Sequence, residues 1–372
     1  MSRILLLCEY STLNGGERSL LALLPTLQRH GCEFLAVAPL DGELASALAK
    51  LQVPLVADLT WNSKPGALQD RRNHLGNVIE RVDVDLIHAN SLAMGRLVGP
   101  VSIAKRIASV AHLRDIVRLS ATAVTDLNCN QRLIAVSAAT RRWHLAQGVK
   151  QEKIDVIYNG MDTDEYLPRV PTGYLHRELG LPHGSVLVGA IGQIGMRKGL
   201  DVLLEAAVDI FQQRHDVHFL IVGQRYSGKQ EAIQYETELH RRADEPALNG
   251  RIHFLGSRAD VPLLLAELTL LVHSARQEPL GRVLLEAAAA GVPVIASDVG
   301  GTREIFPSHE AILIPSGNVQ ALAAAVVKNL DSVDDSRHLQ AIAARRRVQN
   351  VFGVKKAAMA LLDVYREVEG AR

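Results

Sequence analysis

The chain has 372 residues, which is long enough for two domains that each bury a core of their own. Its apolar fraction of 48% excludes a disordered chain, and its net charge of +1 gives no overall electrostatic attraction to nucleic acid or to a membrane. The three cysteines (Cys8, Cys32 and Cys129) are isolated, without a disulfide framework or a metal-ligand spacing, which favours a reducing, cytoplasmic environment.

The N-terminal half alternates short apolar runs with amphipathic segments, a pattern typical of βα units in a parallel sheet. The strands that it predicts are Ile4–Cys8, Phe34–Ala38, Leu55–Ala57, Leu86–His88, Ser109–His112, Leu133–Val136 and Ile154–Ile157. The helices that it predicts include Arg18–His30, Gly76–Val82, Leu92–Ile107 and Ala138–Gln147. The fold class is therefore α/β.

The first apolar run, Ile4–Cys8, predicts a buried strand and not a signal peptide, because Glu9 ends it without a small-residue cleavage site. The sequence also lacks any run of eighteen apolar residues, so we expect no membrane span.

Two adjacent glycines, Gly15 and Gly16, separate the first strand from its helix. They could cradle a phosphate at the helix start or simply form a turn. The full dinucleotide fingerprint Gly-x-Gly-x-x-Gly is absent here, so the pair alone does not decide between these two interpretations.

Two histidines, His88 and His112, close predicted strands. The carboxyl ends of parallel strands are where α/β proteins build their sites, so both are candidates. The alternative is a histidine that caps a strand with its hydrogen bonds satisfied. A loop over Trp61–Asn73, which contains Lys64, Arg71 and Arg72, could contact a glycan, a lipid carrier or a membrane face, or be an ordinary solvated loop.

The second half begins after the turn dipeptide Asn159-Gly160 and a Pro- and Gly-containing linker with a short helix over 168–182. Its predicted strands are Val186–Ile191, Phe219–Val222, Ile252–Leu255 and Leu268–Val272. Its predicted helices include Leu200–Arg214, Lys229–Ala243, Val319–Leu330, Ser336–Val351 and Lys355–Val368.

The loop from Gly192 to Gly199 places two cations, Arg197 and Lys198, between a strand and a helix start. Charge and helix dipole together favour a phosphate site there. The alternative is a pair of solvated charges.

The most informative stretch runs from Ser274 to Glu286, where a strand enters a polar turn and a strongly apolar helix leaves it. Pro279 and Gly281 suit the turn, and the helix start offers free N–H groups to an anion. Glu286 lies on a helix otherwise fit for burial, where a carboxylate needs hydrogen-bond donors. A place on an exposed stripe is the alternative.

This stretch resembles glycosyltransferase family 4, the retaining enzymes that use nucleotide sugars. The resemblance rests on Glu278 and Glu286 with seven residues between them, in the segment Glu-Pro-Leu-Gly-x-x-x-x-Glu-Ala, and on Gly300-Gly301-Thr302-Arg303-Glu304 after it. In the family the first glutamate sits by the donor sugar and the second holds the ribose hydroxyls of the nucleotide.

The resemblance implies further site residues. Gly15 and Gly16 resemble the family's N-terminal glycine loop, with Asn14 where a first glycine is more usual. His112 resembles its histidine near the donor sugar, and Lys198 its diphosphate lysine. Gln193 stands where the family has arginine, a gap that Arg197 could fill, and His273 stands where the family often has proline. The catalytic residues implied are Glu278, His112 and Lys198; the nucleotide-sugar residues implied are Gly15, Gly16, Gly192, Arg197, Lys198, Arg258, Leu280, Gly281 and Glu286.

By this resemblance we expect the GT-B architecture, two Rossmann-like domains facing across a cleft. The expected domains are 1–168 on the acceptor side, 183–352 for the nucleotide sugar, and a final helix over 353–372, containing Tyr365, that crosses back to the first domain. We expect a cytoplasmic, metal-independent glycosyltransferase that takes a UDP- or GDP-linked sugar, needs no cofactor, and acts on a hydroxyl acceptor in glycan, lipid-carrier or small-molecule glycoside synthesis. A peripheral contact with a membrane or a lipid-linked acceptor fits the same expectation.

Three alternatives remain open from the sequence. A nucleotide-sugar epimerase shares this architecture and would act on the donor alone. A phosphorylase would need a lysine that holds pyridoxal phosphate. A sugar-nucleotide-binding protein with an inactive site would be consistent with Gln193 and His273, although Glu278, Glu286 and Lys198 argue against it.

Overall fold

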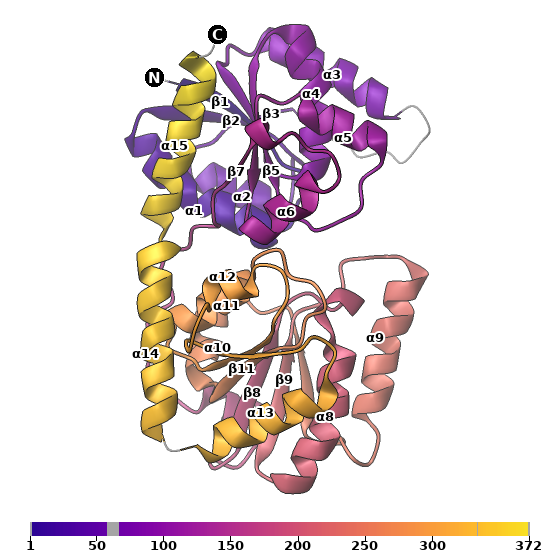
Figure 1. Ribbon diagram of the computed structural model, residues 1–372, viewed down its shortest axis with the longest axis vertical. Coiled ribbons are helices and arrows are strands. Elements are labelled where there is room, and N and C mark those ends of the chain that lie inside the picture. The colour runs from indigo at the N-terminus through magenta and orange to yellow at the C-terminus, as the bar shows by residue number, and fades with distance from the viewer. Residues whose placement is uncertain (1, 58–66, 333, 371–372) are drawn as a thin grey trace. The chain divides into compact units, whose positions relative to one another are not determined.

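The computed structural model describes residues 2–57, 67–332 and 334–370, which form two compact units, one of residues 1–161 with 352–372 and one of residues 162–351 (Figure 1). Each unit is described here by itself. In both, a parallel sheet is flanked by helices, so the prediction of two Rossmann-like domains is confirmed.

The first unit contains a seven-stranded sheet in the order β3-β2-β1-β4-β5-β6-β7. Its strands are β1 Ser2–Leu7, β2 Cys32–Val37, β3 Leu55–Ala57, β4 Leu86–Ala89, β5 Ala108–Leu113, β6 Arg132–Ala135 and β7 Ile154–Val156. Its helices are α1 Gly15–Arg29, α2 Glu43–Lys50, α3 Ala67–Arg81, α4 Leu92–Lys105, α5 Ala121–Asn128, α6 Ala138–Leu145, the short 3-10 turn Gln151–Lys153 and α15 Val354–Gly370.

Strand β1 shows why the sheet is covered on both faces. Ile4 and Leu6 point into a core shared with α1, α2 and α15, whereas Leu5 and Leu7 point into a second core shared with α3, α4 and α5. Successive strand residues face opposite ways, so a continuous apolar run requires cover on both sides. The chain's last helix, α15, supplies part of that cover by packing against α1, so the predicted return of the C-terminal helix is confirmed.

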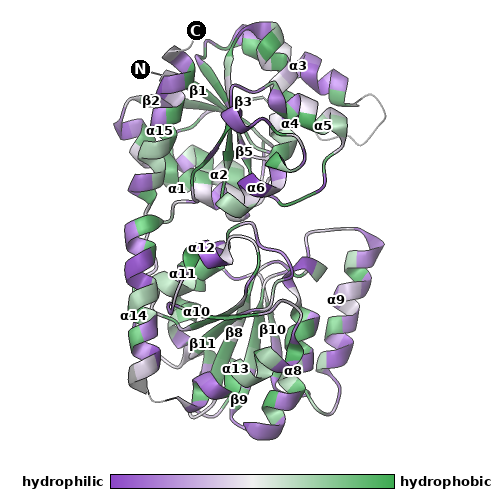
Figure 2. Cartoon of the chain, viewed as in Figure 1, coloured by the Kyte–Doolittle hydropathy of each residue, from purple (hydrophilic) through white to green (hydrophobic). Residues whose placement is uncertain are grey.

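The second unit contains a six-stranded parallel sheet in the order β10-β9-β8-β11-β12-β13. Its strands are β8 Val186–Ile191, β9 Val217–Val222, β10 Ile252–Gly256, β11 Leu270–His273, β12 Val294–Ser297 and β13 Ile312–Ile314. Its helices are α7 Tyr174–Leu179, the 3-10 turn η2 Met196–Lys198, α8 Leu200–Gln213, α9 Gln230–Ala243, α10 Val261–Glu267, α11 Arg282–Ala289, α12 Thr302–Ile305, α13 Val319–Asp331 and α14 Asp334–Val351. Figure 2 shows apolar strands at the centre of each unit and hydrophilic residues on outer helices such as α9.

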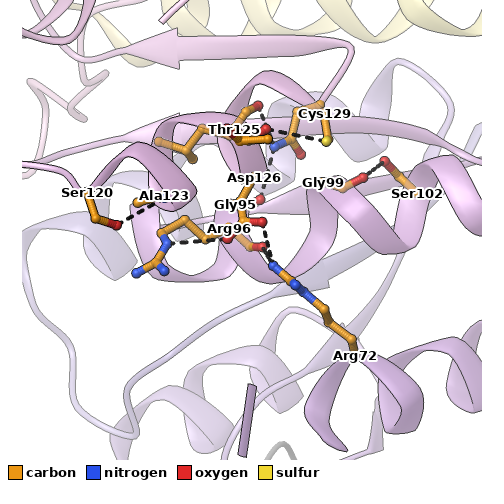
Figure 3. Close-up of polar contacts among 12 residues, drawn as sticks. Arg72, Gly95, Arg96, Gly99, Ser102, Ser120, Ala123, Thr125, Asp126 and Cys129 are labelled. Carbon is orange, nitrogen blue, oxygen red and sulfur yellow. Dashed lines mark hydrogen bonds and ion pairs between the residues drawn. The ribbon is translucent and has the colours of Figure 1, made fainter. Parts of the chain in front are cut away.

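The prediction of a loop as far as Asn73 is wrong where the structure describes it, because α3 begins at Ala67. The helix predicted over Gly76–Val82 thus extends further toward the N-terminus. Arg72 on this added part lies 2.8 Å from a carboxylate oxygen of Asp126 on α5 (Figure 3), a contact between segments far apart in sequence that no local pattern predicts. Trp61 and Lys64, candidates for an acceptor contact, lie outside the described residues. In the described part of the chain, no helix combines the length and apolar character needed to cross a membrane.

Candidate functional site

Two loops of the second unit, one after β8 and one after β11, are fixed to each other. The Ser274 hydroxyl donates a hydrogen bond to the Gly199 carbonyl over 2.8 Å, and the Arg276 N–H donates to the Arg197 carbonyl, also over 2.8 Å. Gly199 has a φ of +63°, and a Cβ there would lie 2.2 Å from the carbonyl oxygen of Ser274. Only glycine permits so close an approach, so these loops are held as one rigid surface.

Lys198 and Glu278, which are eighty residues apart in sequence, form an ion pair on this surface. The ammonium of Lys198 lies 2.5 Å from Oε2 of Glu278. The ring Nε2 of His273, the last residue of β11, lies 2.8 Å from the same oxygen. Glu278 and His273 are both buried, with 6% and 5% of their surfaces exposed. The sugar and diphosphate residues implied by the resemblance are therefore in direct contact here.

The charge state of Glu278 follows from its surroundings. Burial alone would raise the pKa of Glu278, but the charge of Lys198 and the hydrogen bond from His273 hold it well below its usual range. Burial and the same lysine lower the pKa of His273. Glu278 is therefore a fixed anion at neutral pH, held between a cation and a neutral imidazole donor.

The backbone around Glu278 is shaped by the glycines that follow β12. The Gly301 N–H donates to the Glu278 carbonyl over 3.0 Å, and a Cβ on Gly300 would lie 1.8 Å from that carbonyl oxygen. The Gly300-Gly301 pair lies far from Glu278 in sequence. The absence of side chains at these glycines allows the chain to pack directly against the turn that contains Glu278.

Beside the ion pair lies a small recess that is partly open to solvent. Its lining includes Gly192, Gln193, Lys198 and His273. Gln193 accepts a hydrogen bond of 3.2 Å from the exposed guanidinium of Arg197. Arg197, which was considered as the source of the charge that Gln193 lacks, is therefore hydrogen-bonded to Gln193 itself.

Gly281, which has a φ of +102°, immediately precedes helix α11, and Leu280 before it is fully packed. Glu286 on this helix is buried with 7% of its surface exposed, and its Oε1 accepts a hydrogen bond of 2.7 Å from Arg282, one turn earlier. The hydroxyl of Tyr166 also interacts with Arg282. Burial opposes the arginine's charge, but Glu286 raises the pKa of Arg282, so the two form a buried ion pair.

Arg258, a predicted nucleotide residue, has its guanidinium committed to two carboxylates. It lies 2.8 Å from Asp260 in its own loop and 2.6 Å from Glu178 on α7. The hydrogen bond with Asp260 is the main reason that the pKa of Arg258 lies above its usual range, and the hydrogen bond with Glu178 is the next. In this arrangement the side chain of Arg258 links the loop after β10 to α7.

The first unit holds the other predicted residues, Gly15, Gly16 and His112. Gly15 is the first residue of α1, and a Cβ on Gly16 would lie 2.9 Å from the side chain of Arg114. Arg114 in turn donates hydrogen bonds of 2.7 Å to Asn90 and Asn159. Arg114 was not predicted as a site residue, although it follows His112 by two positions at the same strand end.

His112 does not stand alone at the end of β5. Its Nδ1 lies 2.7 Å from Nε2 of His88, and Nδ1 of His88 lies 2.5 Å from the hydroxyl of Tyr365 on α15. Burial and the nearby charge of Arg114 lower the pKa of His88 to about 3 and hold that of His112 well below its usual range. Both imidazoles are therefore neutral at pH 7.

This burial predicts an acid-dependent loss of stability. Unfolded histidine binds a proton below about pH 6.5, whereas folded His88 does so only near pH 3, so between these values the unfolded chain holds more protons and the free energy of unfolding falls as pH falls. The slope is about 1.4 kcal/mol per pH unit for one histidine. His88→Gln should reduce the slope by about that amount in denaturant unfolding measured from pH 6.5 to 4. Parallel curves for the two proteins would contradict the neutral state.

Among residues 2–57, 67–332 and 334–370, no group of three or more His, Cys, Asp or Glu side chains is arranged to hold a metal ion. The charges of Lys198, which belongs to the ion pair, and of Arg197 both act on His273.

Comparison with known proteins matches both units to glycosyltransferase families. The sequence model of "Glycosyl transferases group 1" matches residues 174–347, and that of "Glycosyltransferase Family 4" matches residues 13–165.

Among curated relatives, the lipopolysaccharide core biosynthesis mannosyltransferase LpsB of Rhizobium meliloti is 29% identical over 57% of this chain and 60% of its own. Spore coat protein SA of Bacillus subtilis is 30% identical over 58% of this chain and 59% of its own. The matched region thus spans about three fifths of each relative's length.

Among solved structures, HepE of Anabaena in complex with UDP and glucose superposes with a TM-score of 0.84 at 25% identity, covering 98% of this chain and 100% of HepE. Sucrose-phosphate synthase of Thermosynechococcus elongatus gives a TM-score of 0.80 at 19% identity, with both chains covered completely, and shares the fold.

Proposed function

The chain belongs to the GT-B glycosyltransferases of the family 4 type, and on that premise we propose that it transfers a sugar from a UDP- or GDP-linked donor to a hydroxyl acceptor, with retention of anomeric configuration. The observation that carries this proposal is the partly buried Lys198–Glu278 ion pair beside the recess lined by Gly192 and His273. It places a cation and a hydrogen-bond-accepting anion at one point, as a sugar diphosphate requires.

In the proposed reaction, the diphosphate lies by Lys198 and the start of α11, where cation and helix dipole stabilise the negative charge that grows as the sugar leaves. Glu278, held ionised, accepts hydrogen bonds from the sugar hydroxyls and so orients the ring. The transition state carries positive charge on the sugar, which the nearby carboxylate also favours. The departing phosphate takes the acceptor proton on the same face, which accounts for retention.

The nature of donor and acceptor is proposed from relatives. HepE has been solved with UDP-glucose, so UDP-glucose is the first donor to test. Other relatives are named a D-inositol 3-phosphate glycosyltransferase and a 2-deoxystreptamine glucosyltransferase, and LpsB a lipopolysaccharide core mannosyltransferase. We propose an acceptor hydroxyl on a glycan, a lipid-linked saccharide or a small glycoside.

The proposal is tested by a thermal-shift screen of UDP- and GDP-sugars followed by mass spectrometry of mixtures with candidate acceptors. We expect stabilisation by one donor and a product whose mass increases by one sugar unit. An epimer formed from the donor without any acceptor would replace this function by epimerisation. Binding of a donor without turnover with any acceptor or water would favour a binding protein.

We propose that the reaction needs no metal ion, because Lys198 and the helix start neutralise the diphosphate. Turnover should therefore persist in excess EDTA at close to its full rate. The control is the same assay after addition of Mg²⁺ or Mn²⁺, which should change the rate by less than about twofold. Complete loss in EDTA with restoration by either ion would require metal-assisted departure of the leaving group instead.

We also propose that Arg197 supplies the charge that Gln193 lacks. Arg197→Ala should lower kcat by about tenfold, which is less than a buried cation would give because solvent screens an exposed one. Arg241→Ala, an exposed arginine on α9 that pairs with Glu238, is the matched control and should leave kcat unchanged. If Arg197→Ala has no effect and Gln193→Arg changes neither kcat nor KM, Lys198 is the only cation of this loop that acts.

A further inference from the structure

Three buried polar side chains from three separate elements form a row in the first unit. Tyr365 lies on α15, His88 on β4 and His112 on the adjacent strand β5, with exposed fractions of 0%, 0% and 3%. His88 is paired in register with Val110, so His112, two residues further along β5, lies on the same face of the sheet. The row therefore leads from the C-terminal helix to a strand end.

A neutral imidazole has two ring nitrogens, only one of which carries a hydrogen. The hydrogen bonds along the row can therefore all run in either of two directions. In the first, the Tyr365 hydroxyl donates to Nδ1 of His88, and Nε2–H of His88 donates to Nδ1 of His112. In the second, every hydrogen points the other way and His112 donates from Nδ1. The two directions leave opposite groups at the far end, because Nε2 of His112 is a donor in the first and an acceptor in the second.

The hydroxyl of Tyr365 decides between them. In the second direction this hydroxyl accepts from His88, and its own hydrogen needs another acceptor. Among the described residues its only hydrogen-bond contact is Nδ1 of His88. A buried hydroxyl hydrogen without a partner is unfavourable, so the first direction is preferred.

We propose that Tyr365 is a positioning residue that sets the tautomers of His88 and His112, so that His112 presents an Nε2–H donor at the end of β5. Nε2 of His112 makes no hydrogen bond within the described residues and is not among their buried, unpartnered atoms, so it is the open end of the row. The second step rests on the proposed function: this donor binds an oxygen of the sugar-nucleotide substrate.

The row gives Tyr365 a role on α15 that apolar packing alone does not require. Tyr365 sits in the core formed by α1, α15 and the sheet, where an apolar residue would fill the same space. Its hydroxyl adds nothing to that apolar packing but fixes the hydrogen direction at two strand ends.

The test is long-range ¹H–¹⁵N spectroscopy of the full chain labelled with ¹⁵N-histidine, with His88→Gln and His112→Gln used to assign the signals. We expect both histidines of the wild type as Nε2–H tautomers. In Tyr365→Phe we expect a mixture of tautomers at both positions, and a fall in kcat of about tenfold. Val368→Ala, which removes buried apolar atoms from the same helix, should lower stability but leave both tautomers as in the wild type.

A wild-type His112 carrying its hydrogen on Nδ1, or unchanged tautomers in Tyr365→Phe, would overturn the proposal. The tautomer measurement uses the free protein and does not depend on turnover. If the tautomers change as expected but no nucleotide sugar is used, the proposed function fails and the positioning role of Tyr365 stands. If transfer occurs and Tyr365→Phe shifts the tautomers without lowering kcat, the substrate contact by His112 is excluded.

Discussion

Lys198→Ala should lower kcat by about two to three orders of magnitude, the range for losing one preorganised group that stabilises developing charge. The diphosphate becomes more negative as the sugar departs, so a cation beside it stabilises the transition state more than the bound substrate. The effect should therefore appear mainly in kcat and not in KM. Steady-state kinetics with the donor found in the screen provides the measurement.

The ion pair with Glu278 makes this variant more than a loss of charge. Removing Lys198 leaves a buried carboxylate with His273 as its remaining close partner, and breaking a buried pair costs about 3–5 kcal/mol of stability. Lys198→Met combined with Glu278→Gln restores neutrality and should recover most of that stability while staying inactive. Activity has to be compared at temperatures where each variant is folded.

Glu278→Gln alone separates the role of Glu278 in orienting the sugar from its pairing with Lys198. Because it removes an anion that competes for Lys198, it should bind UDP or GDP without sugar at least as tightly as the wild type, yet turn over far more slowly. If Lys198→Ala raised KM while leaving kcat unchanged, the lysine would bind substrate and transition state equally, and the assigned role would be wrong.

The sequence pattern was sufficient to predict the bounds of elements that are covered on all sides along most of their length. β8 was predicted with the bounds that it has, because both faces of an apolar run in a parallel sheet are covered. The helices α2 and α5 were not predicted. Both are eight residues long, and α5 buries the charged side chain of Asp126, which a pattern of apolar residues does not predict.

The site shows a similar division. Lys198, Glu278 and Glu286 were each identified from local motifs, but the contact between the first two joins loops eighty residues apart and is set by the close approach of Gly199 to Ser274. His273 was interpreted as a departure from the family pattern, whereas its ring holds Glu278. The row from Tyr365 to His112 depends on the packing of α15 against the sheet, which no local pattern encodes.

Arg282, the partner of Glu286, was not predicted, although the sequence contains a local signal for this contact. Arg282 precedes Glu286 by four residues on α11, the spacing at which helix side chains meet. An arginine at that spacing answers the question of how a carboxylate is tolerated on an apolar helix. It also gives the second glutamate a structural role beside the binding role that the resemblance implies, and the two roles have to be separated by experiment.

Glu286→Gln should weaken binding of the nucleoside diphosphate by about 1–3 kcal/mol if the carboxylate accepts hydrogen bonds from the ribose hydroxyls. The sharpest measurement is calorimetry with UDP or GDP and with its 2′,3′-dideoxy analogue, which lacks those hydroxyls. Wild-type protein should bind the analogue more weakly by a similar amount. The variant should distinguish the two ligands less than the wild type does, because its neutral amide oxygen accepts a weaker hydrogen bond than the carboxylate.

Arg282→Met is the matched control, since it removes the other half of the buried ion pair. Both variants should unfold at lower denaturant concentration, because each leaves one charge of the pair without its partner. Arg282→Met, which keeps the carboxylate, should still distinguish the nucleotide from its dideoxy analogue. If instead both variants lose that distinction together, Glu286 acts through the fold of α11. If Glu286→Gln still prefers the nucleotide as strongly as the wild type does, another group binds the ribose.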